Sequence, residues 1–208
     1  LEDGPYEKYY DNGQYQDKGN YKNGEPEGPY ERFYKNGQLG ERGNIKNGKP
    51  DGLYEEYLAG GEISSRKNYK NGELDGLYEE YGKNSIYFRE NYKDGKRDGL
   101  YESYYENGLL SSTGNYKDGE LNGLYEVYYE NGQLSAKQYS KDGKDEGLWE
   151  SYYENGQLME RGNYKDGKVV GLWEGYYENG QLEFKGNFKD GKDQGLSENY
   201  HENGKSMP

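Results

Sequence analysis

The sequence contains no cysteine, which excludes disulfide bonds, thiolate nucleophiles and cysteine-based zinc sites. The usual core residues are also rare, because Leu, Ile, Val and Phe together supply only 27 of the 208 residues. A conventional globular core is therefore excluded. No apolar run approaches the ~20 residues of a transmembrane helix.

Basic residues are also fewer than acidic ones: the chain has 27 Lys and Arg against 40 Asp and Glu, which gives a formal net charge of −13. Nucleic-acid binding depends on Lys and Arg contacts to phosphates, so we expect no nucleic-acid partner. The same charge makes binding to an anionic membrane surface unfavourable. A neutral or cationic partner is compatible with this balance.

What the chain does contain is tyrosine, glycine and a repeat: it has 28 Tyr and 34 Gly. A tetrad of the form Gly-[Leu/Pro]-[Tyr/Trp/Ser]-Glu recurs every 24 residues, with one step of 23. We number the places of each repeat from its first glycine. The sequence predicts a single repeat array over residues 1–208, with a truncated ninth repeat at 195–208 and full repeats starting at 4, 28, 52, 76, 99, 123, 147 and 171.

Two turn signals divide each full repeat into two strands. Asn-Gly stands at the ninth and tenth places of most repeats, and Asn-Gly or Asp-Gly marks a second turn about eleven residues later. These dipeptides favour type I′ turns, in which both central residues have positive φ. The repeats that start at 52 and 76 lack the first Asn-Gly, and we expect an irregularity near residues 58–88.

A two-residue first loop predicts the strand register. The seventh residue would pair with the twelfth (Tyr153 with Leu158), the fourth with the fifteenth (Glu150 with Arg161) and the third with the sixteenth, which would place the Trp149 ring over Gly162. One side of the sheet would carry the third, seventh, twelfth and eighteenth residues. The predicted fold is all-β: an elongated, single-layer antiparallel β-meander built from tandem 24-residue β-hairpins.

The repeat resembles that of a known protein family. Gly-x-Tyr-x-x-Tyr-Tyr-x-Asn-Gly-x-Leu, followed by Gly-Asn-Tyr-Lys-Asp-Gly-Lys, is similar to the bacterial variant of the MORN repeat, often described as YwqK-like antitoxin. The resemblance covers the whole chain. It implies an elongated sheet of hairpins that serves as a binding scaffold, and an antitoxin-like role in a bacterium.

No pattern in the chain predicts catalysis. The recurring fourth-place Glu could act as a general acid or base, but consecutive members would lie ~10 Å apart, and each is expected to form half of a cross-strand ion pair. His201, the one histidine, lacks recurring partners and is expected to be an exposed end residue. The Asp-Gly turns lack the spacing of calcium loops. We therefore predict no enzyme activity, no catalytic residues, no metal and no cofactor.

Exposed aromatic surface is the remaining candidate for function, because a single sheet has nothing packed over it. Trp149 and Trp173 would lie ~10 Å apart on one face. We predict that the binding site for a partner protein is made by Tyr125, Tyr129, Trp149, Tyr153, Trp173 and Tyr177. The alternative is a cell-surface or secreted module that binds carbohydrate or choline through the same rings.

The sequence also bears on assembly and location. We expect a monomer with another protein as its partner and no membrane association. The chain begins at Leu1 and shows no signal peptide, so exported, cell-surface and cytoplasmic locations all fit.

Overall fold

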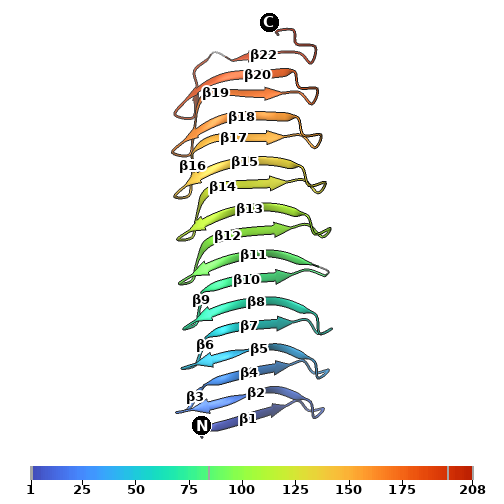
Figure 1. The fold of residues 1–208 in the computed structure, drawn as a ribbon, viewed down its shortest axis with the longest axis vertical. Helices are drawn as coiled ribbons and strands as arrows, with labels where there is room; N and C mark the ends of the chain where they lie inside the picture. The colour runs from blue at the N-terminus through green and yellow to red at the C-terminus, as the bar shows by residue number, and fades with distance from the viewer. Residues whose placement is uncertain (1, 84, 196, 208) are drawn as a thin grey trace. The chain divides into compact units, whose positions relative to one another are not determined.

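The computed structural model describes residues 2–83, 85–195 and 197–207. Residue 84, in the irregular loop of the fourth repeat, and residue 196, in the ninth repeat, lie outside these ranges. The described residues form strands, turns and bends without any helix, so the protein is all-β. The chain divides into two compact units, an N-terminal unit up to Gly99 and a C-terminal unit from Leu100. Within each unit, Figure 1 shows successive antiparallel hairpins.

The N-terminal unit is a series of antiparallel hairpins in one layer. Each repeat contributes a strand of six residues, a strand of eight, and a short strand before the next repeat. The strands are β1 (Gly4–Tyr9), β2 (Tyr15–Lys22), β3 (Glu25–Pro26), β4 (Gly28–Phe33), β5 (Leu39–Lys46), β6 (Lys49–Pro50), β7 (Gly52–Tyr57), β8 (Ile63–Lys70), β9 (Glu73–Leu74), β10 (Gly76–Tyr81) and β11 (Ile86–Lys93).

The C-terminal unit repeats this arrangement, and in several repeats the short strand is continuous with the six-residue strand that follows it. Its strands are β13 (Leu110–Lys117), β14 (Glu120–Tyr128), β15 (Leu134–Lys141), β16 (Lys144–Asp145), β17 (Gly147–Tyr152), β18 (Leu158–Lys165), β19 (Lys168–Tyr176), β20 (Leu182–Lys189), β21 (Lys192–Asp193) and β22 (Glu198–Asn199). The strand β12 (Lys96–Tyr104) contains the residue at which the two units divide.

The predicted register holds in the middle of each hairpin and fails at the first loop. Trp149 pairs with Gly162 and Glu150 with Arg161, as predicted. Leu158, however, pairs with Tyr152 and not with Tyr153. The prediction that the seventh residue pairs with the twelfth is therefore wrong.

The physical reason lies in two compensating irregularities. The first loop has three residues, 154–156, between a closing pair in which the Tyr153 N–H donates to the Gln157 carbonyl at 2.8 Å. Only Gly156 has positive φ there (+83°), so the loop is a type I turn followed by a left-handed glycine and not a type I′ turn. A β-bulge two residues later restores the predicted register.

The second turn of each full repeat is of type I′, as predicted. Both of its central residues have positive φ, as in Asp166 (+51°) and Gly167 (+77°). Asn and Asp tolerate the left-handed region better than other residues with a Cβ. A carboxylate just before the repeat caps many of these turns, as where Glu146 accepts the Asp166 N–H at 3.0 Å.

The bulge also assigns side chains to the two faces of each unit. The twelfth residue lies opposite the sixth, as shown by the stacked rings of Tyr9 and Tyr15 at 4.8 Å. It therefore shares a face with the fourth and fifteenth residues, which we call the charged face. The third, fifth, fourteenth, sixteenth and eighteenth residues form the opposite aromatic face. The expectation that the twelfth residue lies on the aromatic face is wrong.

Burial is shallow in both units, as a single layer requires. Among the described hydrophobic residues Tyr30 alone is buried, at 8% exposure, and most other buried residues are Ser, Asp or Glu. The described residues contain no helix that could cross a membrane. The core of each unit is consequently a row of half-buried rings along the sheet and not an enclosed interior.

Candidate functional site

The third-place aromatics line the aromatic face of the C-terminal unit. Trp149 on β17 and Trp173 on β19 belong to successive repeats, with β18 between them. Their ring centroids are 5.1 Å apart and the ring planes differ by 20°. The predicted ~10 Å separation is wrong for the side chains, because the two rings lean toward each other and stack above β18.

A strand glycine makes this approach possible. A Cβ placed on Gly162 would lie 1.9 Å from the Trp173 ring, so any other residue there would displace the ring. The prediction assigned this glycine to Trp149, its partner in the same repeat, but the ring nearest to the glycine comes from the next repeat. Tyr125 covers Gly114 in the same way.

Trp173 is also fixed by polar and aromatic contacts. Its indole Nε1 donates to Glu160 Oε2 at 3.2 Å, and the Tyr164 ring meets it edge-on at a centroid distance of 5.7 Å. The large ring is thus held in one orientation before any partner binds. Such preorganisation reduces the entropy lost on association.

The predicted seventh-place tyrosines have a different environment. Tyr129, Tyr153 and Tyr177 lie at the first loop, and each phenol donates to a main-chain carbonyl of the following repeat at 2.7–2.8 Å. The acceptors are Tyr152, Tyr176 and Tyr200. These hydroxyls are therefore occupied by the fold, and the rings alone remain available to a partner.

The ninth-place asparagine completes this connection. Asn131 Nδ2 donates to the Glu154 carbonyl of the next repeat at 3.3 Å, while its Oδ1 accepts the Gln133 N–H at 2.8 Å. We call the pair of bonds from the seventh-place Tyr and the ninth-place Asn the loop clamp. Sequence reasoning treated this asparagine only as a turn residue.

A sequence signal for the loop clamp exists. The seventh-place Tyr and the ninth-place Asn occur together in most repeats and are lost together in the third, where Leu58 and Gly60 stand. The fourth repeat has Gly82 at the seventh place, and there the Gly82 N–H donates to the Ser85 carbonyl at 2.8 Å across a shorter loop. The co-occurrence of the two residue types in most repeats is the signal that could have indicated a shared role.

The fourth-place carboxylates of the charged face form ion pairs with basic side chains of the same face. Glu55 has a 6% exposed side chain and ion pairs at 2.5 Å with Arg42 and 3.1 Å with Arg66. Burial by itself would raise the pKa of the Glu55 carboxyl, but hydrogen bonds from the two guanidinium groups outweigh it and lower that pKa. Glu150 pairs with Lys137 of the preceding repeat at 2.6 Å. The structural interpretation of the fourth-place carboxylates accounts for these contacts.

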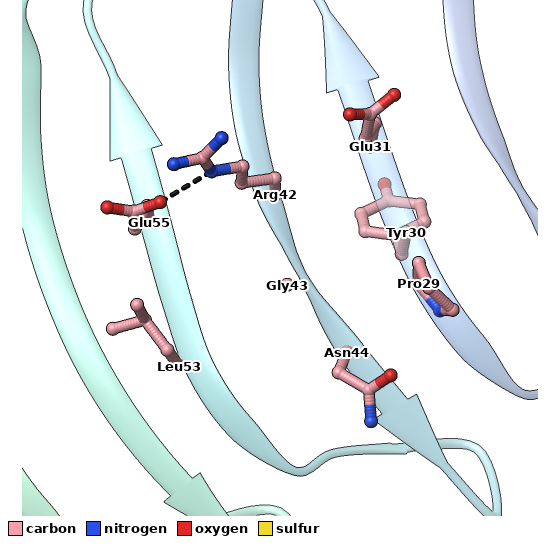
Figure 2. Close-up of a pocket in the computed structure, with 8 residues that line it drawn as sticks. All are labelled: Pro29, Tyr30, Glu31, Arg42, Gly43, Asn44, Leu53 and Glu55. Atoms are coloured by element: carbon pink, nitrogen blue, oxygen red, sulfur yellow. Dashed lines mark hydrogen bonds and ion pairs between the residues drawn. The ribbon is translucent and has the colours of Figure 1, made fainter.

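A shallow groove of about 450 Å³ opens on the charged face of the N-terminal unit. Figure 2 shows Pro29 and Leu53 on either side of the strand that carries Arg42, Gly43 and Asn44. Its charged side chains are Arg42 and Glu55, which form an ion pair (Figure 2), and Glu31, which pairs with Lys18 at 3.1 Å. Because these charges already neutralise each other, the groove offers little to a charged ligand.

The many carboxylates of the described residues do not gather into a metal site. Within residues 2–83, 85–195 and 197–207, no group of three or more His, Asp or Glu side chains is arranged to hold a metal ion. His201 is exposed, and its backbone N–H donates to the Lys205 carbonyl. The aromatic face is the surface on which the predicted tryptophans converge.

Among the comparisons with known proteins, only the family models are informative for this chain. No protein with a curated description matches the chain. A solved structure described as "Crystal Structure of TcdB2-TccC3-Cdc42" aligns with 94% of this chain at 11% identity and a TM-score of 0.26, and the chain spans only 13% of that protein, so this likeness carries no argument.

The model of the MORN repeat variant matches seven times, and the matches omit the irregular fourth repeat. The matched residues are 2–23, 26–47, 50–71, 97–118, 121–144, 145–166 and 169–190, which together cover most of the sequence. The chain therefore belongs to the MORN repeat variant family.

Proposed function

We propose that the chain is a non-enzymatic scaffold that binds another protein through the aromatic face of its C-terminal unit. The stacked Trp149–Trp173 pair is the observation that carries this proposal. Tryptophan is enriched among residues that dominate interface energies, and this pair is held in place before binding. Tyr125 and the rings of Tyr129, Tyr153 and Tyr177 would flank it. An antitoxin-like, inhibitory complex in a bacterium is the specific form that the family resemblance suggests.

The stacked pair also supports a second candidate. Tryptophan faces bind quaternary ammonium groups through cation–π contacts, and flat rings suit sugar faces. A cell-surface or secreted module that binds choline or carbohydrate would use the same two rings. This candidate differs from the first in the chemistry of the ligand and not in the site.

A matched pair of double variants tests the proposal. The unaltered chain is first immobilised as bait to capture partner proteins from source lysate and culture medium. Mass spectrometry then identifies the captured proteins. We expect Trp149→Ala with Trp173→Ala to weaken binding of the captured protein at least about tenfold, equal to ~1.4 kcal/mol. The control, Leu148→Ala with Leu172→Ala, changes two exposed residues on the same strands but the opposite face.

Circular dichroism must show an intact sheet for both variants. Equal loss in the two variants, or loss only in the leucine variant, would show that the aromatic face is not the binding surface. Retention of the bait on choline or glycan resins, with no captured protein, would favour the second candidate.

A further inference from the structure

The aromatic faces of the two units differ in whether their carboxylates have basic partners. In the N-terminal unit, three aromatic-face carboxylates have basic partners on the same face. Lys8 pairs with Asp17 at 3.4 Å, Arg32 with Glu41 at 3.0 Å, and Lys67 with Glu56 at 2.8 Å. These ion pairs neutralise three of the carboxylates on this face.

The C-terminal unit lacks such partners by sequence. From Gly99 onward, Lys and Arg are absent from the third, fifth, seventh, fourteenth, sixteenth and eighteenth places, and from the bulge at the thirteenth. Glu160, at the fourteenth place, brings a carboxylate to this face with no ion pair among the described residues, and Glu183 stands at the bulge of the next repeat, directly before Phe184 of the same face. The described neighbour of the Glu160 carboxylate is the Trp173 indole N–H.

Carboxylates also follow the adjoining loop edge. The eighth place is Glu in five successive repeats, and all five side chains are exposed: Glu106, Glu130, Glu154, Glu178 and Glu202. The N-terminal unit has Asp11, Lys35, Ala59 and Lys83 there. Burial raises the pKa of Tyr153, and the nearby charges of Glu183, Glu178 and Glu160 raise it further, so these carboxylates lie close enough to act on one phenol.

The composition of the units agrees with this local contrast. Each unit carries 20 Asp and Glu, but the N-terminal unit has 16 Lys and Arg and the C-terminal unit only 11. Net charges of −4 and −9 follow. Most of the excess negative charge therefore belongs to the unit that also holds both tryptophans.

One polar group on this face is left without a partner. Ser151, on β17, lies two residues after Trp149 and two before Tyr153, and it pairs with Glu160 across the hairpin. Its side chain is buried, at 8% exposure, and its Oγ forms no hydrogen bond with the residues that the structure describes. An unsatisfied buried hydroxyl costs free energy unless something supplies the missing bond.

We infer that the aromatic face of the C-terminal unit binds an arginine-bearing, basic segment of a partner protein. This inference rests on the proposed function and names the chemistry of its partner. Guanidinium groups stack on aromatic faces and form charge-assisted hydrogen bonds with carboxylates. Trp149 and Trp173 supply the rings, Glu160 supplies the carboxylate in contact with Trp173, and Glu183 supplies a second one at the adjacent bulge. The eighth-place Glu residues form a negative edge that attracts the segment.

A defined peptide tests the inference before any partner protein is identified. Labelled octa-arginine is titrated into the full chain at low salt, with octa-lysine and octa-glutamate for comparison. We expect octa-arginine to bind more tightly than octa-lysine, octa-glutamate not to bind, and the affinity to fall at ~0.15 M salt. Equal binding of octa-lysine would overturn the assignment of arginine.

Charge-neutral variants locate the site. Glu160→Gln with Glu183→Gln should weaken octa-arginine binding by about tenfold, because two carboxylates are lost beside the rings. The control, Asp166→Asn with Asp190→Asn, removes the same charge at the type I′ turns, where Asn23 and Asn47 show that asparagine fits. Equal weakening by the control would show attraction to net charge alone and overturn the inference.

The captured protein separates this inference from the proposed function. If its binding is lost in the Trp149→Ala, Trp173→Ala variant but is unaffected by Glu160→Gln with Glu183→Gln and by salt, the scaffold function stands and the basic-segment inference fails. If binding survives the tryptophan changes, the proposed function itself fails.

Discussion

At the scale of single residues, tyrosine has three distinct structural uses in this chain. Third-place rings cover strand glycines, whereas seventh-place phenols donate to the main chain of the next repeat. Sixth-place phenols form a further set and donate to the fourth-place carboxylate on the charged face, as Tyr152 does to Glu150 at 2.8 Å. A chain with few aliphatic residues thus obtains both packing area and directional bonds from one amino acid.

Removing a single phenolic oxygen tests the seventh-place bond. Tyr153→Phe should lower the free energy of unfolding by about 0.5–1.5 kcal/mol, the net contribution of one hydrogen bond, because the Tyr176 carbonyl loses its donor. Tyr139→Phe is the control, since that ring is 51% exposed and lies outside the loop clamp. Urea denaturation measures both. A shift as large in the control would contradict the assigned role.

At the scale of the hairpin, the two turns of a repeat have different requirements. The first needs one left-handed residue, the glycine, and the second needs two, an Asn or Asp followed by glycine. In the early repeats both turns contain the dipeptide Asn-Gly, although the conformations of the two turns differ. The hydrogen bonds of the flanking residues, and not the dipeptide, select the turn.

Substitution at the second turn checks this difference. Asp166→Ala should destabilise the protein by about 1–2 kcal/mol, because alanine pays the full steric cost of φ near +51°. Asp166→Asn should be close to neutral, since Asn23, Asn47 and Asn71 adopt the same conformation. Thermal unfolding followed by circular dichroism compares the two variants. Similar melting temperatures for both would argue against a type I′ turn.

The hairpin is also where sequence reasoning succeeded and failed. The pairing of Glu150 with Arg161 could be predicted because opposite charges and the glycine at the sixteenth place favour one register. The pairing of Leu158 with Tyr152 could not be predicted. The loop is one residue longer than expected and the bulge adds one unpaired residue to the next strand, so the two shifts in register cancel within five residues and the repeat length does not change. The spacing also indicated that Trp149 and Trp173 lie on one face, but the directions of their rings depend on side-chain rotamers that spacing does not encode.

At the scale of the whole molecule, shallow burial makes the response to pH a property of many tyrosines. Burial, and next the charge of Glu41 or a hydrogen bond to Glu80, raises the pKa of Tyr30, Tyr54 and Tyr78. A phenol with a raised pKa stays neutral in the folded chain, so its contribution to stability is present below the ordinary pKa near 10. That contribution is lost as pH rises through the higher folded pKa.

The expected outcome is a urea midpoint that changes little up to about pH 9 and falls above about pH 10. Ultraviolet absorbance of phenolate, with urea-unfolded protein as the reference, should show part of the 28 tyrosines ionising only together with loss of the sheet. If all tyrosines ionise at the pH of the unfolded reference while circular dichroism stays constant, burial does not hold these phenols neutral.

The loop clamp finally bears on how a chain of this kind can change in length over generations. Its donors are side chains of one repeat, whereas its acceptors are main-chain carbonyls, which every amino acid supplies. A gene that gains or loses one 24-codon segment therefore produces a new junction with working acceptors, whatever residues the neighbour carries. Recombination between similar segments can lengthen or shorten the array, while drift at the fifth and fourteenth places alters the surface without disturbing the junctions.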